Sequence, residues 1–173
     1  MKIVLISVAL FFLSWQDVAA VEGICVQGNC KSGKGVFVWE DGGQYNGQWK
    51  KGKRDGRGEM VYPDEEQYSG QWKAGKRHGK GSMTYLEDET YSGDWRSDSR
   101  SGTGTMTYET GEVFKGEWKN NNWHGKGMYI FPDGTRFSGH WQNNVKHGQG
   151  KRTFPGGRVE TVEYQHGVLI EKT

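Results

Sequence analysis

The sequence predicts an all-β protein, a single-layer elongated antiparallel β-sheet built from stacked 23-residue β-hairpins. An aromatic-x-Gly-x-Trp segment occurs five times at a constant spacing of 23 residues. Gly-x-Gly pairs recur six times at the same spacing, beginning at Gly33. Hydrophobic residues make up only 33% of the chain, whereas aromatic residues reach 13%, with eight Trp. Such periodicity is typical of repeat arrays, in which each unit buries its apolar face against its neighbours. The composition favours a thin core of aromatic rings.

Each repeat is predicted to be one β-hairpin, because side chains of a strand alternate between its two faces. In the first repeat, residues 45–49 place Tyr, Gly and Trp on one face and polar residues on the other. Residues 51–56 form a charged, glycine-rich turn, and residues 58–62 form the second strand. Residues 63–66 then lead to the next repeat. Stacking these hairpins in series gives a meander.

The glycines predict the curvature of the sheet and the contacts of its rings. A glycine between two aromatic residues on one strand face leaves bare backbone over which a ring can lie. Gly56, Gly79 and their equivalents are expected at turns, where a positive φ is accessible to glycine. We therefore expect a curved sheet with one aromatic, glycine-rich face and one polar face.

The repeat boundaries follow from the spacing. Residues 21–44 form an N-terminal cap with a half repeat, and residues 160–173 form a degenerate C-terminal cap. In the C-terminal cap the aromatic-x-Gly-x-Trp signature is lost, and Val168–Ile170 is expected to be the last strand. Five full repeats lie between the caps, at residues 45–67, 68–90, 91–113, 114–136 and 137–159.

Residues 1–20 are interpreted as a secretory signal peptide. Lys2 precedes an apolar run over residues 3–13, and small residues end at Ala20, where cleavage is expected. The run would span only about 16 Å as a helix, which is short for a membrane anchor. The predicted location is secreted, periplasmic or otherwise extracytoplasmic. Since Cys25 and Cys30 are the only cysteines of the chain, a disulfide between them is the simplest expectation in an oxidising compartment.

These motifs resemble the MORN (membrane occupation and recognition nexus) repeat over about residues 33–167. The third repeat departs from the pattern, because Asp98 stands where the first two repeats have glycine. The fourth and fifth repeats have Asn121 and Asn144 there, and asparagine also tolerates left-handed backbone geometry. The resemblance implies a single-layer β-sheet, no intrinsic catalysis, and roles in scaffolding, protein–protein contact or binding of anionic phospholipids.

The aromatic face is the leading candidate for contact with a protein partner, because a contiguous apolar surface marks an interaction site. Alternatively, the same rings are simply the thin core of the sheet. Carbohydrate binding by ring stacking carries less weight, and self-association through strand edges stays open. The predicted partner-binding groove consists of Tyr45, Trp49, Tyr68, Trp72, Tyr91, Trp95, Phe114, Trp118, Phe137 and Trp141.

Basic residues beside the turns form a second candidate surface, which would bind anionic phospholipid head groups at a membrane surface. The alternative is a charged edge that discourages aggregation of sheets. The predicted basic rim consists of Lys53, Arg54, Lys76, Arg77, Arg100 and Lys146.

No catalytic, cofactor or metal site is predicted. His78, His124 and His147 share one repeat position, but consecutive repeats lie about 10 Å apart, too far for common metal ligation. The formal net charge of +2 gives no indication of nucleic-acid binding. The sequence therefore favours a secreted or envelope-resident, non-catalytic repeat scaffold that binds protein, with the lipid-binding module as the alternative.

Overall fold

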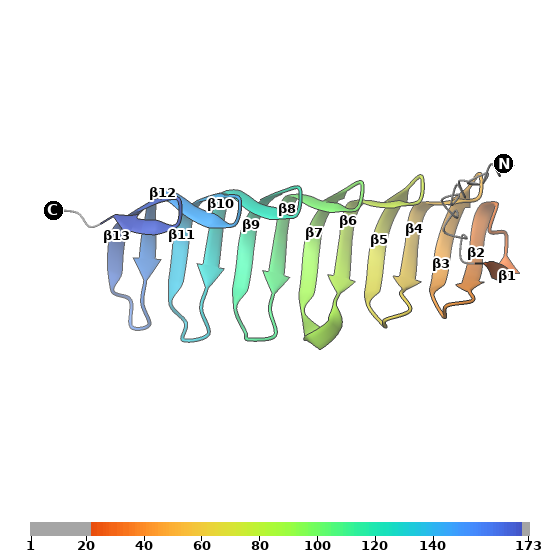
Figure 1. Ribbon diagram of the computed structural model, residues 1–173, viewed down its shortest axis with the longest axis horizontal. Coiled ribbons are helices and arrows are strands. Elements are labelled where there is room, and N and C mark those ends of the chain that lie inside the picture. Colours follow the sequence, from red (N-terminus) through yellow and green to blue (C-terminus); the bar gives the residue numbers. More distant parts are fainter. Residues whose placement is uncertain (1–21, 171–173) are drawn as a thin grey trace, which may run out of the picture.

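A computed structural model describes residues 22–170 as one open sheet of 14 antiparallel strands. The strands follow one another in chain order, so the molecule is an elongated meander with its two ends far apart (Figure 1). The predicted leader and its cleavage site lie outside the described residues. The strands are β1 (Gly23–Gly28), β2 (Ser32–Trp39), β3 (Gln44–Lys50), β4 (Lys53–Val61), β5 (Gln67–Lys73), β6 (Lys76–Thr84), β7 (Thr90–Arg96), β8 (Ser99–Thr107), β9 (Val113–Lys119), β10 (Asn122–Ile130), β11 (Arg136–Gln142), β12 (Val145–Thr153), β13 (Val159–Gln165) and β14 (Val168–Ile170).

Two kinds of connection alternate along the two edges of the sheet. From β3 onward, two-residue turns lie along the upper edge in Figure 1, and Lys51 and Gly52 both have positive φ there, 52° and 71°. Positive φ at both central residues is the requirement of a type I′ turn, whose twist matches that of the strands it joins. Loops of four residues (40–43) or five residues lie along the lower edge, each closed by a backbone bond such as that from Tyr62 N–H to the Glu66 carbonyl, at 2.9 Å. One of these loops contains the short 3-10 turn η1 (Leu86–Asp88).

The turn predicted at residues 51–56 is shorter in the structure, because β4 already begins at Lys53. Gly56 has the expected positive φ, 104°, but it lies inside β4 at a β-bulge rather than in the turn. The side chain of Gln48 covers this glycine, and a Cβ there would stand within van der Waals radius of the Gln48 amide. Gln48 Oε1 in turn accepts a hydrogen bond from the Arg57 backbone N–H at 2.7 Å. In the last five Gly-x-Gly pairs the first glycine therefore lies at a β-bulge, whereas Gly33 pairs in regular register with Trp49.

The second glycine of each pair belongs to a continuous row that crosses the sheet. Glycines on successive strands are paired directly, as Gly47 is with Gly58 and Gly58 is with Gly70. A Cβ on Gly58 would lie 2.2 Å from Tyr45 Oη, so the ring occupies the space of the missing side chain. The glycine row consists of Gly35, Gly47, Gly58, Gly70, Gly81, Gly93, Gly104, Gly116, Gly127, Gly139 and Gly150.

The core is a single layer of rings on one face of the sheet, here called the aromatic face. The tryptophans of the repeats pack edge to face against rings of their own and the preceding repeat, as Trp72 does against Tyr68 at 5.0 Å and Tyr45 at 5.4 Å between centroids. Edge-to-face contacts are a favoured geometry for aromatic pairs. The polar atoms of the rings are satisfied by the backbone: Trp72 Nε1 donates to the Gly58 carbonyl at 3.2 Å, and Tyr68 Oη donates to the Gln71 carbonyl at 3.0 Å.

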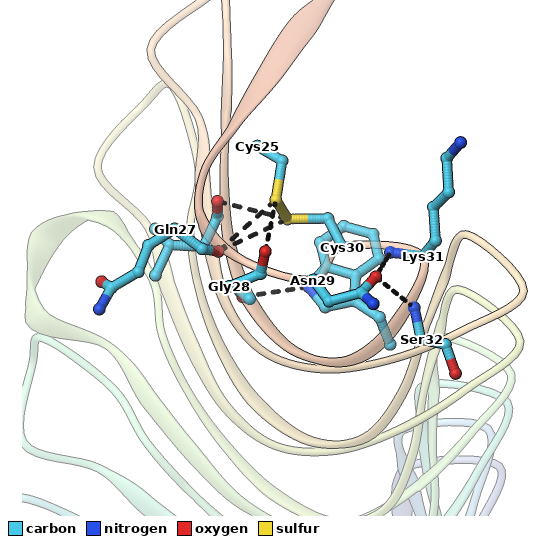
Figure 2. The surroundings of a disulfide bond; sticks show 10 residues. Cys25, Gln27, Gly28, Asn29, Cys30, Lys31 and Ser32 are labelled. Atoms are coloured by element: carbon cyan, nitrogen blue, oxygen red, sulfur yellow. Dashed lines mark hydrogen bonds between the residues drawn. A yellow bond between two sulfur atoms is a disulfide. The ribbon is translucent and has the colours of Figure 1, made fainter.

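Both ends of the array depart from the repeat. Cys25 and Cys30 form the predicted disulfide in the hairpin that joins β1 to β2 (Figure 2). The side chain of Asn29 accepts hydrogen bonds from the backbone N–H groups of Lys31 and Ser32, which holds this turn closed. At the other end Val168–Ile170 forms β14, as expected, and Tyr164 fills the position of the repeat tryptophan with 5% of its surface exposed.

Candidate binding surfaces

The ten aromatic residues predicted to line a binding groove are buried, with exposed fractions between 0% and 8%. Each ring is enclosed by the backbone of the glycine row beneath it and by rings of the adjacent repeats. Partial burial raises the pKa of the Tyr45 phenol to about 12, an effect that the positive charge of Arg54 and the bond to the Gln48 carbonyl reduce. The rings therefore form the core, the second of the two interpretations, and offer little surface to a partner.

Three members of the predicted basic rim cover the aromatic face instead of extending from the edge. The guanidinium carbons of Arg54, Arg77 and Arg100 lie 4.2, 4.5 and 4.6 Å from the ring centroids of the next tryptophans along the chain. These distances are typical of cation–π contacts. Arg77 also forms a salt bridge with Asp98, with its Nε 3.4 Å from Oδ1. These three arginines therefore contact other residues of the protein instead of forming an exposed basic edge. The repeat spacing alone did not reveal this.

The other rim residues lie in different surroundings. Lys53 and Lys76 are exposed beside the two-residue turns. The ammonium of Lys146 lies over Phe137 and Tyr164, at 4.9 and 5.1 Å from their centroids, and burial lowers its pKa. In the fourth repeat Trp123 takes the position of the arginines and stacks on Phe114 at 4.5 Å. The predicted rim is therefore not one continuous basic surface.

An open groove of about 1160 Å³ lies on the opposite, polar face of the sheet. Backbone of the glycine row forms its floor, and two rows of side chains form its walls. One wall carries mainly short hydroxyl and amide side chains such as Asn46, Ser69 and Ser92, together with Glu59 and Lys115. The other wall carries longer side chains, among them the cations between the paired glycines. We call this the polar groove; its charged lining residues are Lys34, Arg57, Glu59, Lys80, Lys115, Glu117 and Lys126.

The cations of the polar groove are regularly placed. Lys34, Arg57, Lys80 and Lys126 each occupy the centre of a Gly-x-Gly pair, with Thr103 at the remaining such position within the groove. Lys80 is ion-paired, since its Nζ lies 2.8 Å from Asp94 Oδ1. Partial burial tends to raise the pKa of that carboxyl, but hydrogen bonds from Lys80 and Thr103 more than offset it, and the net shift is downward.

The sequence interpretation missed this surface, although a signal for it was present. The central residue of the Gly-x-Gly pairs is Lys, Arg, Lys, Thr, Lys and Gln in order along the chain. The sequence interpretation used the glycines to predict turns and close ring contacts, and it gave no role to the residue between them. Because strands alternate their faces, a cation between two glycines of the aromatic face must point to the other side of the sheet.

The three histidines of the shared repeat position, His78, His124 and His147, lie on the separate strands β6, β10 and β12. His124 and His147 each have a buried Nδ1 without a hydrogen-bond partner, and the ring of His147 lies 5.3 Å from that of His166. Within residues 22–170, no group of three or more His, Cys, Asp or Glu side chains is arranged to hold a metal ion. Over the same residues, no helix is long and apolar enough to cross a membrane.

The fold and these surfaces define a repeat protein in which one β-sheet carries a core on one face and an open polar groove on the other. A family model described as the MORN repeat matches residues 31–44, 45–66, 68–85, 91–113, 114–136 and 137–157. The chain therefore belongs to the MORN-repeat family, as the sequence motifs suggested.

Comparison with solved structures finds more distant likenesses. The TCP10 domain of Danio rerio CPAP, solved with a peptide of Danio rerio STIL, is 17% identical with a TM-score of 0.49; the match covers 82% of this chain and 64% of that one. The TCP domain of SAS-4 (dCPAP) from Drosophila melanogaster, solved with a proline-rich motif of Ana2, is 12% identical with a TM-score of 0.37, covering 93% and 96%. Comparison with curated protein sequences gives no match.

Proposed function

We propose that this protein is a non-catalytic scaffold that holds a segment of a protein partner in its polar groove. The observation that carries the proposal is the difference between the two faces. The rings of one face are buried in the core, and the other face has an open groove of about 1160 Å³. Its floor of glycine lets a ligand approach the backbone closely, and its walls offer hydroxyl, amide and charged groups for hydrogen bonds.

The rigidity of the array suits this role. Each repeat contacts its neighbours through rings, backbone ladders and turn-to-turn bonds such as that from Gly75 N–H to the Arg54 carbonyl, at 2.8 Å. A surface that is already ordered avoids the entropy cost of ordering on binding. The scaffold therefore presents a long, preformed contact surface.

A blocking substitution with a matched control tests the location. Ser69 and Ser138 occupy the same repeat position and are both exposed, but only Ser69 lines the groove. We expect Ser69→Trp to abolish photo-cross-linking of a partner from a probe placed at Ser92, and Ser138→Trp to leave it intact. Equal cross-linking in both variants, or cross-links only from a probe at Lys53 on the rim, would contradict a partner in the groove.

We further propose that the scaffold works outside the cytosol, after cleavage at Ala20. The Cys25–Cys30 disulfide supports this, because structural disulfides persist in oxidising compartments. The intact mass of natively expressed protein, measured without reductant, decides it. A mass beginning at Val21 and lacking two hydrogens supports export. A full-length, reduced mass would favour the membrane-associated alternative, which vesicle flotation with and without anionic lipid then tests.

A further inference from the structure

We infer that the polar groove selects an acidic, extended protein segment whose carboxylates are spaced one repeat apart, so that two of them face Lys34 and Arg57. This inference rests on the proposed function and specifies the chemistry of the segment. It starts from the charges of the lining, where five basic side chains face two acidic ones. With Lys80 neutralised by Asp94 at 2.8 Å, four basic side chains remain against two acidic ones, so the groove keeps an excess of positive charge.

The two cations at the N-terminal end of the groove lack partners of their own. Within the described residues, neither Lys34 nor Arg57 takes part in an ion pair, and both side chains are exposed. By contrast, Lys80 is held by Asp94 at 2.8 Å. An unpaired cation on a groove wall is available to a ligand without breaking an existing contact. Lys34 and Arg57 are therefore the expected recognition residues.

The spacing of these cations fixes the form of the segment. Lys34 lies on β2 and Arg57 on β4, with β3 between them. At about 4.8 Å per strand, the two strands that carry these cations are about 10 Å apart. A polyproline II segment advances about 3.1 Å per residue with three residues per turn, so it repeats one face about every 9.3 Å. Carboxylates three residues apart would thus meet Lys34 and Arg57 in turn, whereas in the next repeats Lys80 is already paired with Asp94 and Thr103 stands in place of a cation. A β-strand would turn alternate carboxylates away.

The length of the groove is adequate for such a segment. Its lining extends from Lys34 on β2 to Lys126 on β10, which is about 38 Å across the strands. About 12 residues in polyproline II conformation span that distance. Glu59 and Glu117 within the lining would oppose carboxylates placed beside them, so they restrict the position at which an acidic segment can lie.

Synthetic peptides and two matched double variants test the inference. The probe is a labelled peptide of repeated Glu-Pro-Pro triplets, and binding to the natively expressed protein is followed by fluorescence anisotropy. We expect Lys34→Gln with Arg57→Gln to weaken binding about tenfold, since two exposed ion pairs are removed. Lys53→Gln with Lys76→Gln removes the same charge from the turn edge and should leave the affinity unchanged. Circular dichroism verifies that both variants are folded.

The outcomes separate this inference from the proposed function. Equal weakening by both double variants would mean attraction to net charge alone and would overturn the inference, as would equal binding of Gln-Pro-Pro triplets. A peptide of the same composition with its glutamates adjacent should bind less well; equal binding would refute the one-per-repeat spacing. If the probe fails to bind while cross-linking still places a partner at Ser92, the acidic specificity is wrong and the groove proposal stands. If cross-linking instead avoids the groove, the proposed function itself fails.

Discussion

The guanidinium of Arg54 lies over the indole ring of Trp72, with its Cζ 4.2 Å from the ring centroid. The same side chain donates from Nη2 to the Gly75 carbonyl at 2.9 Å and approaches Met60 Sδ at 3.5 Å. One cation therefore covers the thin core, joins two repeats and satisfies the carbonyl of a turn. The arrangement recurs at Arg77 and Arg100, so it is a property of the first three repeats.

Replacement of this arginine tests its contribution to stability. We expect Arg54→Ala to lower the free energy of unfolding by about 2 kcal/mol, because it removes a cation–π contact and a hydrogen bond from a half-buried site. Chemical denaturation followed by tryptophan fluorescence measures the loss. The adjacent, exposed Lys53→Ala should change stability by less than about 0.5 kcal/mol. A similar small effect of both substitutions would show that Arg54 is a solvated rim residue after all.

The glycine row is expected to tolerate no side chain where a ring covers it. In Gly58→Ala the new Cβ would lie 2.2 Å from Tyr45 Oη and 2.4 Å from Cζ. The ring must leave its site, and we expect a loss of about 3 kcal/mol or more. Thermal unfolding by circular dichroism measures it. Arg57→Ala, one residue earlier and on the opposite face, is the control; equal melting temperatures of the two variants would contradict the assigned packing.

In contrast to the two substitutions above, which are expected to destabilise the protein, an asparagine introduced at the second turn position is expected to stabilise it. In the fourth repeat Asn121 occupies the second turn position with φ 69°, and its Oδ1 accepts a hydrogen bond from the Arg100 N–H at 2.8 Å. In the second repeat Gly75 occupies the equivalent turn position with a φ of 89°, but it has no side chain to accept such a hydrogen bond. Gly75→Asn should therefore stabilise the protein, by up to about 1 kcal/mol. The midpoint of urea unfolding reports it, and Gly75→Val, which cannot adopt this φ readily, should destabilise.

Alkaline pH is expected to weaken the first three repeats. Tyr45, Tyr68 and Tyr91 each donate to a backbone carbonyl at 3.0 or 3.1 Å, and burial raises the pKa of all three phenols. The unfolded chain releases these protons near pH 10.0, whereas folded Tyr45 retains its proton until about 12. Their contribution to stability is therefore complete below pH 10 and decreases as the pH rises from 10 toward 12.

Phenylalanine provides the control for this pH dependence, because Phe114 and Phe137 occupy the same position in the last two full repeats. Replacing the three tyrosines by Phe should cost about 1 kcal/mol per lost hydrogen bond at neutral pH. The same variant should show a shallower decline of stability above pH 10 in denaturation series. An unchanged slope would mean that other groups govern alkaline unfolding.

The disulfide is expected to stabilise the N-terminal end of the array. Because the closed loop is short, with a sequence separation of 5, the chain-entropy estimate is about 2 kcal/mol. Cys25→Ser with Cys30→Ser should increase hydrogen exchange in β1 and leave β5 to β11 protected, since each strand pairs only with its neighbours. Reductant should reproduce this effect in the native protein and do nothing to the variant. Loss of protection throughout the array would show global rather than local stabilisation.

The sequence by itself determined the repeat unit, the strand order, the sidedness of the sheet and the disulfide pair. These features depend on local periodicity: a spacing of 23 residues fixes the hairpin, and alternation along each strand places Tyr45 and Trp49 on one face. The same reasoning correctly anticipated β14 at Val168–Ile170.

Only the tertiary structure decided where the surfaces are. Spacing does not show that Arg54 turns inward over Trp72, because that choice depends on a ring supplied by the next repeat. Nor does it show that a bulge at Gly56 shortens the turn, or that the rings bury one another so fully that the open surface lies on the other side. Side-chain direction and mutual burial arise from contacts between strands, and a one-dimensional pattern does not contain them.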